Sequence, residues 1–329
     1  IIMLEDEIGS DYKVLTGLEP AGITELHQSG SNRQYFRLKC SRPSVVAAYN
    51  EDIRENRAFF YLTRHFQHLG IPVPELLYVS PSEKTYLLSD LGDTTLFSLL
   101  MRDKDAGRGI SGQVSGLYEK VIQRLADFQV RGGKNLDYRH CYPREAYDEQ
   151  SIRWDLNYFK YYFLKLSGIS FDEQALEDDY LSLQNELLKT DLQYFMYRDF
   201  QSRNIMIVNN EPWFIDYQGG RRGALQYDVA SLLYDAKADL NPGFREHLLA
   251  IYLDRIKSTA GVLRTSFMRY FPLFVLIRIL QALGAYGFRG YFERKALFLQ
   301  SIPYALANLE GILGSVREVI NLPHLSDIF

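Results

Sequence analysis

Hydrophobic and polar residues in the first ninety positions alternate as they do in short β-strands, with one helical stretch among them. From about Asp52, apolar residues recur with helical spacing and the pattern ends at Gly70. Four segments have the composition of strands: residues 35–38, 44–49, 75–79 and 85–88. The polar stretch 28–34 looks like a loop between an earlier strand and the returning strand 35–38. This part of the chain therefore predicts a small β-rich unit with one helix.

Beyond residue 90 the pattern becomes mainly helical, with apolar residues on one face of the segments 117–128, 154–166 and 176–187. One β-type interruption occurs, in which the apolar run 205–208 and the run 213–215 flank a turn-rich tetrapeptide. We expect an α+β protein with an N-terminal lobe at residues 1–89. A hinge near residue 90 would join it to a helical lobe at residues 90–329 that contains the hairpin.

Polar residues capable of metal chemistry surround this hairpin. Asp199 and Asn204 precede its first strand, and Asp216 follows its second. In an antiparallel hairpin the start of one strand lies beside the end of the next, so Asn204 and Asp216 should be neighbours. Carboxylate and amide oxygens suit Mg²⁺ and its phosphates, and phosphoryl transfer also needs a carboxylate to orient the attacking hydroxyl. The hairpin therefore predicts a magnesium-dependent phosphoryl-transfer site.

Composition and charge exclude several other classes of protein. The net charge of −4 provides no strong basic field for nucleic acid or an anionic membrane. Cys40 and Cys141 lack the spacing of a zinc site or a disulfide framework. The N-terminus lacks the features of a signal peptide, and the longest apolar run, residues 270–277, is too short to span a bilayer. We expect a cytoplasmic protein without nucleic-acid or membrane partners.

Three stretches resemble known kinase motifs. Residues 197–204, Tyr-Arg-Asp-Phe-Gln-Ser-Arg-Asn, resemble the catalytic loop H-R-D-x-x-x-x-N, and residues 215–218, Ile-Asp-Tyr-Gln, resemble the metal-binding loop. Residues 227–233, Tyr-Asp-Val-Ala-Ser-Leu-Leu, look like the Y-D-L-A helix start of aminoglycoside phosphotransferase-like kinases. The chain thus resembles that family, which implies the two-lobed protein-kinase-like fold and an enzyme that transfers phosphate from ATP to a small-molecule alcohol.

The resemblance also implies a role for each residue of the catalytic segment. Asp199 would be the catalytic base, and Asn204 and Asp216 the Mg²⁺ ligands. Arg198 and Asp228 would brace the catalytic loop, although Asp228 alternatively serves as a plain helix N-cap. Arg203, in the same loop, is expected to be a solvated charge, and Tyr197 stands where the family usually has histidine.

In the N-terminal lobe the resemblance implies a set of nucleotide contacts. Glu55 lies on the helix where the family keeps the glutamate that pairs with a strand lysine. The backbone of a polar loop, poor in glycine, would cradle the phosphates. Together with two hinge residues, the expected contacts are Ser29, Gly30, Ser31, Asn32, Arg33, Glu55, Ser89 and Leu91.

The chain departs from the family at the strand lysine, because residues 45–49 are Val-Val-Ala-Ala-Tyr. The charge that contacts the α- and β-phosphates is missing, and Arg33, Arg37 and Lys39 are the candidates to supply it. Without a substitute, nucleotide affinity would be weak and the protein would be a pseudokinase scaffold. The retention of all three residues of the chemical centre favours an active enzyme.

A finer resemblance is to the N-acetylmuramate/N-acetylglucosamine anomeric kinases of bacterial cell-wall recycling. Asp216-Tyr217-Gln218 with the later Gly223 looks like their DFQ…G signature, and residues 278–284 look like their R-h-L-x-x-L-G helix. That branch also lacks the strand lysine. The resemblance implies an amino-sugar substrate that is bound in part by Gln218 and Arg278. Arg278 has an alternative, structural role, as a buried arginine paired with an Asp of the helical lobe.

Other small alcohols remain open as substrates, namely aminoglycosides, choline and homoserine. Polycationic aminoglycosides need an acidic pocket near the C-terminus. The last fourteen residues contain only Glu318 and Asp327 as acids, which disfavours aminoglycosides.

Overall fold

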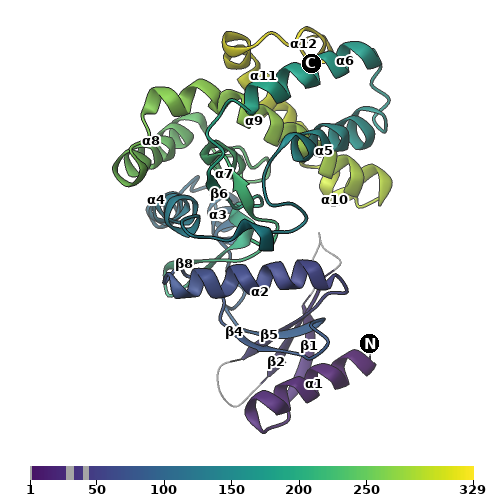
Figure 1. The fold of residues 1–329 in the computed structure, drawn as a ribbon, viewed down its shortest axis with the longest axis vertical. Helices are drawn as coiled ribbons and strands as arrows, with labels where there is room; N and C mark the ends of the chain where they lie inside the picture. The colour runs from purple at the N-terminus through teal and green to yellow at the C-terminus, as the bar shows by residue number, and fades with distance from the viewer. Residues whose placement is uncertain (1, 27–32, 40–43) are drawn as a thin grey trace.

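The computed structural model describes residues 2–26, 33–39 and 44–329, which form a small sheet-based lobe and a larger helical lobe (Figure 1). The small lobe contains a five-stranded antiparallel sheet with the strand order β1-β2-β3-β5-β4. Its strands are β1 (Gly22–Leu26), β2 (Gln34–Lys39), β3 (Val45–Tyr49), β4 (Leu76–Val79) and β5 (Thr85–Ser89). The four strands predicted from the sequence are confirmed, and β1 is the strand expected before the polar loop.

Two helices cover opposite faces of this sheet. The predicted helix is confirmed as α2 (Ile53–His68), whose N-cap Asp52 accepts hydrogen bonds from the backbone N–H groups of Arg54 and Glu55. The helix α1 (Ile2–Thr16) packs Ile8 and Tyr12 against the other face. In Figure 1, α2 lies between the sheet and the helical lobe, and α1 lies on the far side. We expected one helix in this lobe, and this was wrong. The sequence pattern missed α1 because this helix buries only a narrow stripe of residues, so its hydrophobic periodicity is weak.

The large lobe is built mainly from helices, as predicted. Its α-helices are α3 (Leu96–Asp105), α4 (Gly112–Ala126), α5 (Glu149–Phe159), α6 (Glu173–Leu187), α7 (Leu225–Leu233), α8 (Pro242–Ala260), α9 (Arg264–Gly287), α10 (Ala296–Leu299), α11 (Ile302–Val319) and α12 (Pro323–Ile328). Short helical turns are η1 (Asp127–Gly132), η2 (Tyr138–His140), η3 (Lys160–Leu164), η4 (Ser202–Asn204) and η5 (Phe288–Phe292). Helix α9 is the centre of this lobe and packs on α5, α7 and α11.

Within the described residues, two helical segments are long and apolar enough to cross a membrane, Arg264–Phe292 and Ala296–Val319. The apolar stretch is therefore longer than the run 270–277 that we identified in the sequence. In the first segment, which contains α9, 67% of the apolar window is buried inside the protein. Burial of most of this window explains why the helix is apolar around most of its circumference.

The predicted hairpin is confirmed as β7 (Ile205–Val208) and β8 (Glu211–Phe214). Its turn consists of Asn209 and Asn210, both with positive φ, and not of the tetrapeptide that we expected. Asparagine tolerates this left-handed conformation, which matches the twist of the strands. A second two-stranded sheet, of β6 (Tyr194–Met196) and β9 (Arg221–Gly223), was not predicted because its strands are very short. Since β5 ends at Ser89 and α3 begins at Leu96, we propose the lobe boundary at residue 89.

Candidate active site

The open end of the β7–β8 hairpin brings the predicted catalytic residues together. The backbone N–H of Ile215 donates to the carbonyl of Asn204 at 3.1 Å, which places Asn204 beside the start of the next loop. The Asn204 side chain then donates through Nδ2 to Asp216 Oδ2 at 3.1 Å and to the backbone oxygen of Asp199 at 2.9 Å. Asp199, Asn204 and Asp216 therefore form one cluster, although they lie on two different loops.

The electrostatics of this cluster suit a cation. Burial, and then the charge of Asp199, raise the pKa of the Asp216 carboxyl above its usual value. Asp216 also has a φ of +70°, a conformation that is uncommon for non-glycine residues and that occurs in turns and at functional sites. Among the described residues none donates a hydrogen bond to the Asp199 carboxylate, so this group is available to an incoming alcohol.

The donor atoms present fit a magnesium ion that is shared with a nucleotide. Both contacts of Asn204 use its amide nitrogen, which leaves the amide oxygen for a metal, next to the Asp216 carboxylate. Mg²⁺ usually takes one or two such protein ligands and completes its shell with phosphates and water. In the described part of the chain no group of three or more His, Cys, Asp or Glu residues is placed to hold a metal, so the two-ligand arrangement is the relevant one.

The catalytic loop is held by Asp228, a buried residue of α7. Its carboxylate accepts hydrogen bonds from the backbone N–H groups of Tyr197 at 2.7 Å and Arg198 at 2.9 Å, and from the Gln129 side chain at 3.2 Å. Burial raises the pKa of Asp228 to about 7, although the two N–H groups act in the opposite direction. The N-cap of α7 is Ala224, so the plain N-cap role for Asp228 is wrong.

Arg198 is anchored on its other side by Asp155 of α5. Arg198 Nη1 donates to Asp155 Oδ2 at 2.7 Å and Nη2 donates to Oδ1, which makes a two-point ion pair. The Tyr147 hydroxyl donates to the same carboxylate at 2.9 Å. Sequence reasoning missed Asp155. The available signal was an acid on the buried face of a helix, one turn after Ile152 and beside Leu156.

Tyr197, in the place of the usual histidine, connects the two loops of the site. Its side chain is buried, and its hydroxyl donates to the backbone oxygen of Ile215, the residue before Asp216. The aromatic ring packs edge to face on Phe200 and Phe128. Tyr197 therefore links the catalytic loop to the loop that contains Asp216.

In the N-terminal lobe, the predicted nucleotide contacts divide into two groups. Ser29, Gly30, Ser31 and Asn32 lie outside the described residues. Arg33 is buried and forms an ion pair with Glu55, with 3.0 Å between Nη2 and Oε2. The Ser89 hydroxyl accepts the Glu75 backbone N–H at 2.8 Å, and Leu91 is half-buried directly after β5.

The two predicted substrate residues lie on different elements and have different partners. Gln218 donates through Nε2 to Asp216 Oδ1 at 2.7 Å and so orients the carboxylate that we predict to bind the metal. Arg278, on α9, is 6% exposed and donates to Ser231 Oγ at 3.0 Å and to Gln281 Oε1 at 2.8 Å. Both of these partners are neutral, and the alternative ion pair with an Asp is not found among the described residues.

Arg203 differs from the solvated charge that we expected. Its side chain is half-buried, and its guanidinium lies 5.8 Å from the centre of the Phe97 ring at the start of α3. The catalytic loop therefore places a cation against the first turn of α3.

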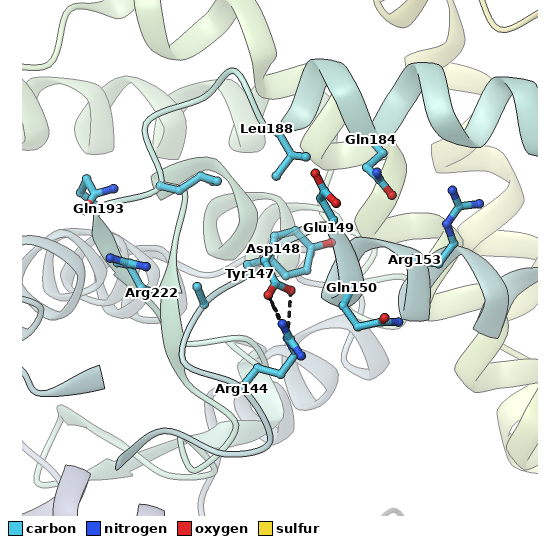
Figure 2. A pocket seen from close by; sticks show the side chains of 12 residues that line it. Arg144, Tyr147, Asp148, Glu149, Gln150, Arg153, Gln184, Leu188, Gln193 and Arg222 are labelled. Atoms are coloured by element: carbon cyan, nitrogen blue, oxygen red, sulfur yellow. Dashed lines mark hydrogen bonds and ion pairs between the residues drawn. The ribbon is translucent and has the colours of Figure 1, made fainter. Parts of the chain in front are cut away.

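A separate surface pocket of about 670 Å³ lies beside the start of α5 and is shown in Figure 2. Part of its charge is neutralised, because Arg144 pairs with Asp148 and Arg153 pairs with Glu177. The lining residues Glu149 and Arg222 form no ion pair with the described residues. Tyr147 connects this pocket to the Asp155–Arg198 pair. None of Asp199, Asn204 and Asp216 lines it, so we assign the chemistry to the hairpin cluster and no ligand to this pocket.

The chain is similar to known proteins along most of its length. A curated N-acetylmuramate/N-acetylglucosamine kinase from Pseudomonas aeruginosa is 26% identical over 315 residues, covering 93% of this chain and 88% of the relative. A protein of the same name from Neisseria meningitidis is 23% identical over 296 residues, covering 88% and 85% of the two chains.

Solved structures share the fold at lower identity. The structure of amicoumacin kinase, solved with AMP-PNP, Ca²⁺ and its ligand, superposes with a TM-score of 0.65 at 13% identity over 93% of each chain. A choline kinase from Streptococcus pneumoniae superposes with a TM-score of 0.58 at 14% identity, covering 94% of this chain and 99% of that one.

These neighbours confirm the protein-kinase-like two-lobed fold. The profile of the "Phosphotransferase enzyme family" matches residues 22–263, which include the five-stranded sheet, helix α2 and the whole hairpin cluster. The chain therefore belongs to the phosphotransferase enzyme family and is a small-molecule kinase.

Proposed function

We propose that this chain is an ATP- and magnesium-dependent kinase that phosphorylates the anomeric hydroxyl of an N-acetylated amino sugar. The observation that carries the proposal is the Asp199 carboxylate, which accepts no hydrogen bond from the described residues and lies beside the Asn204–Asp216 pair. Relatives named N-acetylmuramate/N-acetylglucosamine kinases, matched along most of their length, support the choice of sugar.

The chemistry follows from the roles that this geometry allows. Asp199 accepts a hydrogen bond from the sugar hydroxyl and takes its proton as the oxygen attacks the γ-phosphorus of ATP. The new bond joins that oxygen to phosphorus, the bond to the β,γ-bridging oxygen breaks, and the products are a sugar 1-phosphate and ADP. Mg²⁺, held by Asp216 and Asn204, supplies positive charge to the phosphate oxygens when it is bound. Gln218 and Tyr197 keep the loop that carries Asp216 in place.

Arg278 is the residue that we assign to sugar recognition. A buried cation is costly unless it has a partner of opposite charge or strong dipoles. The described partners of Arg278 are the neutral side chains of Ser231 and Gln281. A substrate carbonyl or carboxylate, such as an N-acetyl oxygen or a lactyl group, would complete its coordination. Because the donor is ATP, we place the enzyme in the cytoplasm.

Two alternative functions have to be distinguished from this one by experiment. The fold is shared with choline kinases and aminoglycoside phosphotransferases, so another small alcohol is the second candidate substrate. A nucleotide-binding scaffold without turnover is the candidate from another class, because β3 lacks the strand lysine.

The decisive assay measures ATP consumption with N-acetylglucosamine, N-acetylmuramate, their 1-O-methyl glycosides, choline and kanamycin. The proposal expects turnover with the free sugars, a sugar 1-phosphate in the ³¹P spectrum, and no reaction with the methyl glycosides, whose acceptor oxygen is capped. The Asp199→Asn variant serves as the control for contaminating kinases. Equal phosphorylation of the methyl glycosides, or turnover with choline or kanamycin alone, contradicts the anomeric assignment. ADP binding without turnover on any of these substrates supports the scaffold.

A further inference from the structure

Two half-buried cations lie beside the catalytic loop without an ion pair. Arg203 directly precedes Asn204, and Lys237 lies in the segment that follows α7. Within the described part of the chain neither side chain donates a hydrogen bond or forms an ion pair, and the Arg203 Nε atom is buried without a partner. A charge that has lost part of its hydration usually gains a partner in the protein, so these two groups have unused binding capacity.

The buried Asp235 carboxylate holds the two cations in one region. Its Oδ2 atom accepts a hydrogen bond from Ser202 Oγ at 3.2 Å, and Ser202 is the chain neighbour of Arg203. Its Oδ1 atom accepts the backbone N–H of Lys237, also at 3.2 Å. Because one carboxylate is bonded to both segments, the residues that carry the two cations are fixed close to each other.

The charges of this region are not balanced. Burial, and then the charge of Arg203, lower the pKa of the Lys237 ammonium, whereas Asp235 acts in the opposite direction. The nearby Lys104 and Asp239 pair with each other at 3.7 Å. One acid therefore stands against two cations that repel each other, and an anion bound between them would remove this repulsion.

Tyr286, on the same helix as Arg278, connects this region to the residue that we assign to the sugar. Burial, and then Asp235, raise the pKa of the Tyr286 hydroxyl to about 12, while Arg278 and Arg203 lower it. Since all three charges act on one hydroxyl, they lie around it. The Arg203 cation is therefore on the same side of the catalytic loop as Arg278.

Successive residues of the catalytic loop point in different directions. The Asn204 side chain contacts the Asp199 backbone and Asp216, where we expect the nucleotide phosphates and their magnesium ion. The Arg203 guanidinium instead lies 5.8 Å from the centre of the Phe97 ring, at the start of α3. The elements around the two cations, namely η4, α3, the segment after α7 and α9, all belong to the helical lobe. An anion at this place therefore comes from the acceptor and not from the nucleotide.

We propose that Arg203 and Lys237 bind a carboxylate of the acceptor sugar, so that the enzyme prefers an N-acetylated amino sugar with a carboxylate substituent, such as N-acetylmuramate, over a neutral one. Guanidinium and ammonium groups form strong charge-assisted hydrogen bonds with carboxylates. Arg278 then remains for the N-acetyl oxygen. The inference rests on the proposed sugar kinase function and adds to it which sugar the site prefers.

The test compares N-acetylmuramate with its lactyl methyl ester, because the ester keeps the bulk of the substituent and removes its charge. For the parent protein we expect a kcat/KM for the acid about 10- to 100-fold above that for the ester, the size of one or two charged hydrogen bonds. This preference should largely disappear in Lys237→Met and in Arg203→Met, and Lys237→Arg should restore it. Lys257→Met is the matched control, since Lys257 is an exposed lysine of α8, and it should keep the parent preference.

A ratio of two substrates makes this test independent of a general loss of activity. Equal kcat/KM for acid and ester in the parent protein, or an unchanged ratio in Lys237→Met, overturns the inference. A higher KM for ATP with an unchanged ratio also overturns it, because the cations would then serve the nucleotide phosphates. If Lys237→Met does not fold, as judged by thermal unfolding, the neutral and more polar Lys237→Gln replaces it with the same expected loss. A parent protein that phosphorylates neither N-acetylmuramate nor N-acetylglucosamine refutes the proposed function itself, which is a different result.

Discussion

The Asp155–Arg198 ion pair allows a quantitative test of how the catalytic loop is held. The Asp155 side chain is 5% exposed and that of Arg198 is 15% exposed, so water screens the pair poorly. Asp155→Asn removes the negative charge at nearly constant volume and leaves a buried guanidinium without a counter-charge. Breaking a buried ion pair in this way costs about 3–5 kcal/mol.

This free energy converts into a measurable change in the unfolding temperature. For a chain of 329 residues the unfolding entropy is about 0.7 kcal/mol/K, so the expected fall is about 4–7 °C. Calorimetry without nucleotide measures it, and Glu83→Gln is the matched control. That variant breaks the exposed Arg57–Glu83 pair and should cost less than about 1 kcal/mol.

A double-mutant cycle separates the loss of attraction from the cost of the unpaired charge. Arg198→Met in the Asp155→Asn background removes the buried cation, so the double variant should be more stable than Asp155→Asn alone. A fall of less than about 1 °C in Asp155→Asn, or a double variant that is less stable than both single variants, refutes the reasoning.

Three predictions concern the chemistry of the site. Asp199→Asn should lower kcat by about 100- to 10,000-fold because it removes the catalytic base. The unfolding temperature should not change, because the Asp199 carboxylate accepts no hydrogen bond from the described residues. A turnover near that of the parent protein would exclude this role. Asp216→Ala should abolish the magnesium-dependent part of the ATP-induced thermal shift, and an unchanged shift would place the metal elsewhere. Arg278→Ala should raise the KM for the sugar more than the KM for ATP, measured with both substrates varied, and equal changes would indicate a structural arginine.

The features that follow from consecutive residues were predictable without coordinates. Helical spacing after Asp52 predicted α2, and alternating residues predicted the strands around it. The hairpin placed Asn204 beside Asp216, because antiparallel pairing is a local constraint once the strands and turn are recognised. Only the length of the turn was wrong, since two asparagines with positive φ close it. The chemical centre could therefore be assembled from a short segment of the chain.

The partners of the buried charges, by contrast, emerged only from the tertiary structure. Arg33 meets Glu55 across 22 positions, Arg198 meets Asp155 across 43, and Asp228 accepts the Tyr197 N–H across 31. A buried charge requires a partner, but the requirement does not say which of many acids and bases will supply it. Packing of α2 on the sheet, and of α5 and α7 around the catalytic loop, decides that choice, because a short-range interaction depends on position in space and not on separation along the chain.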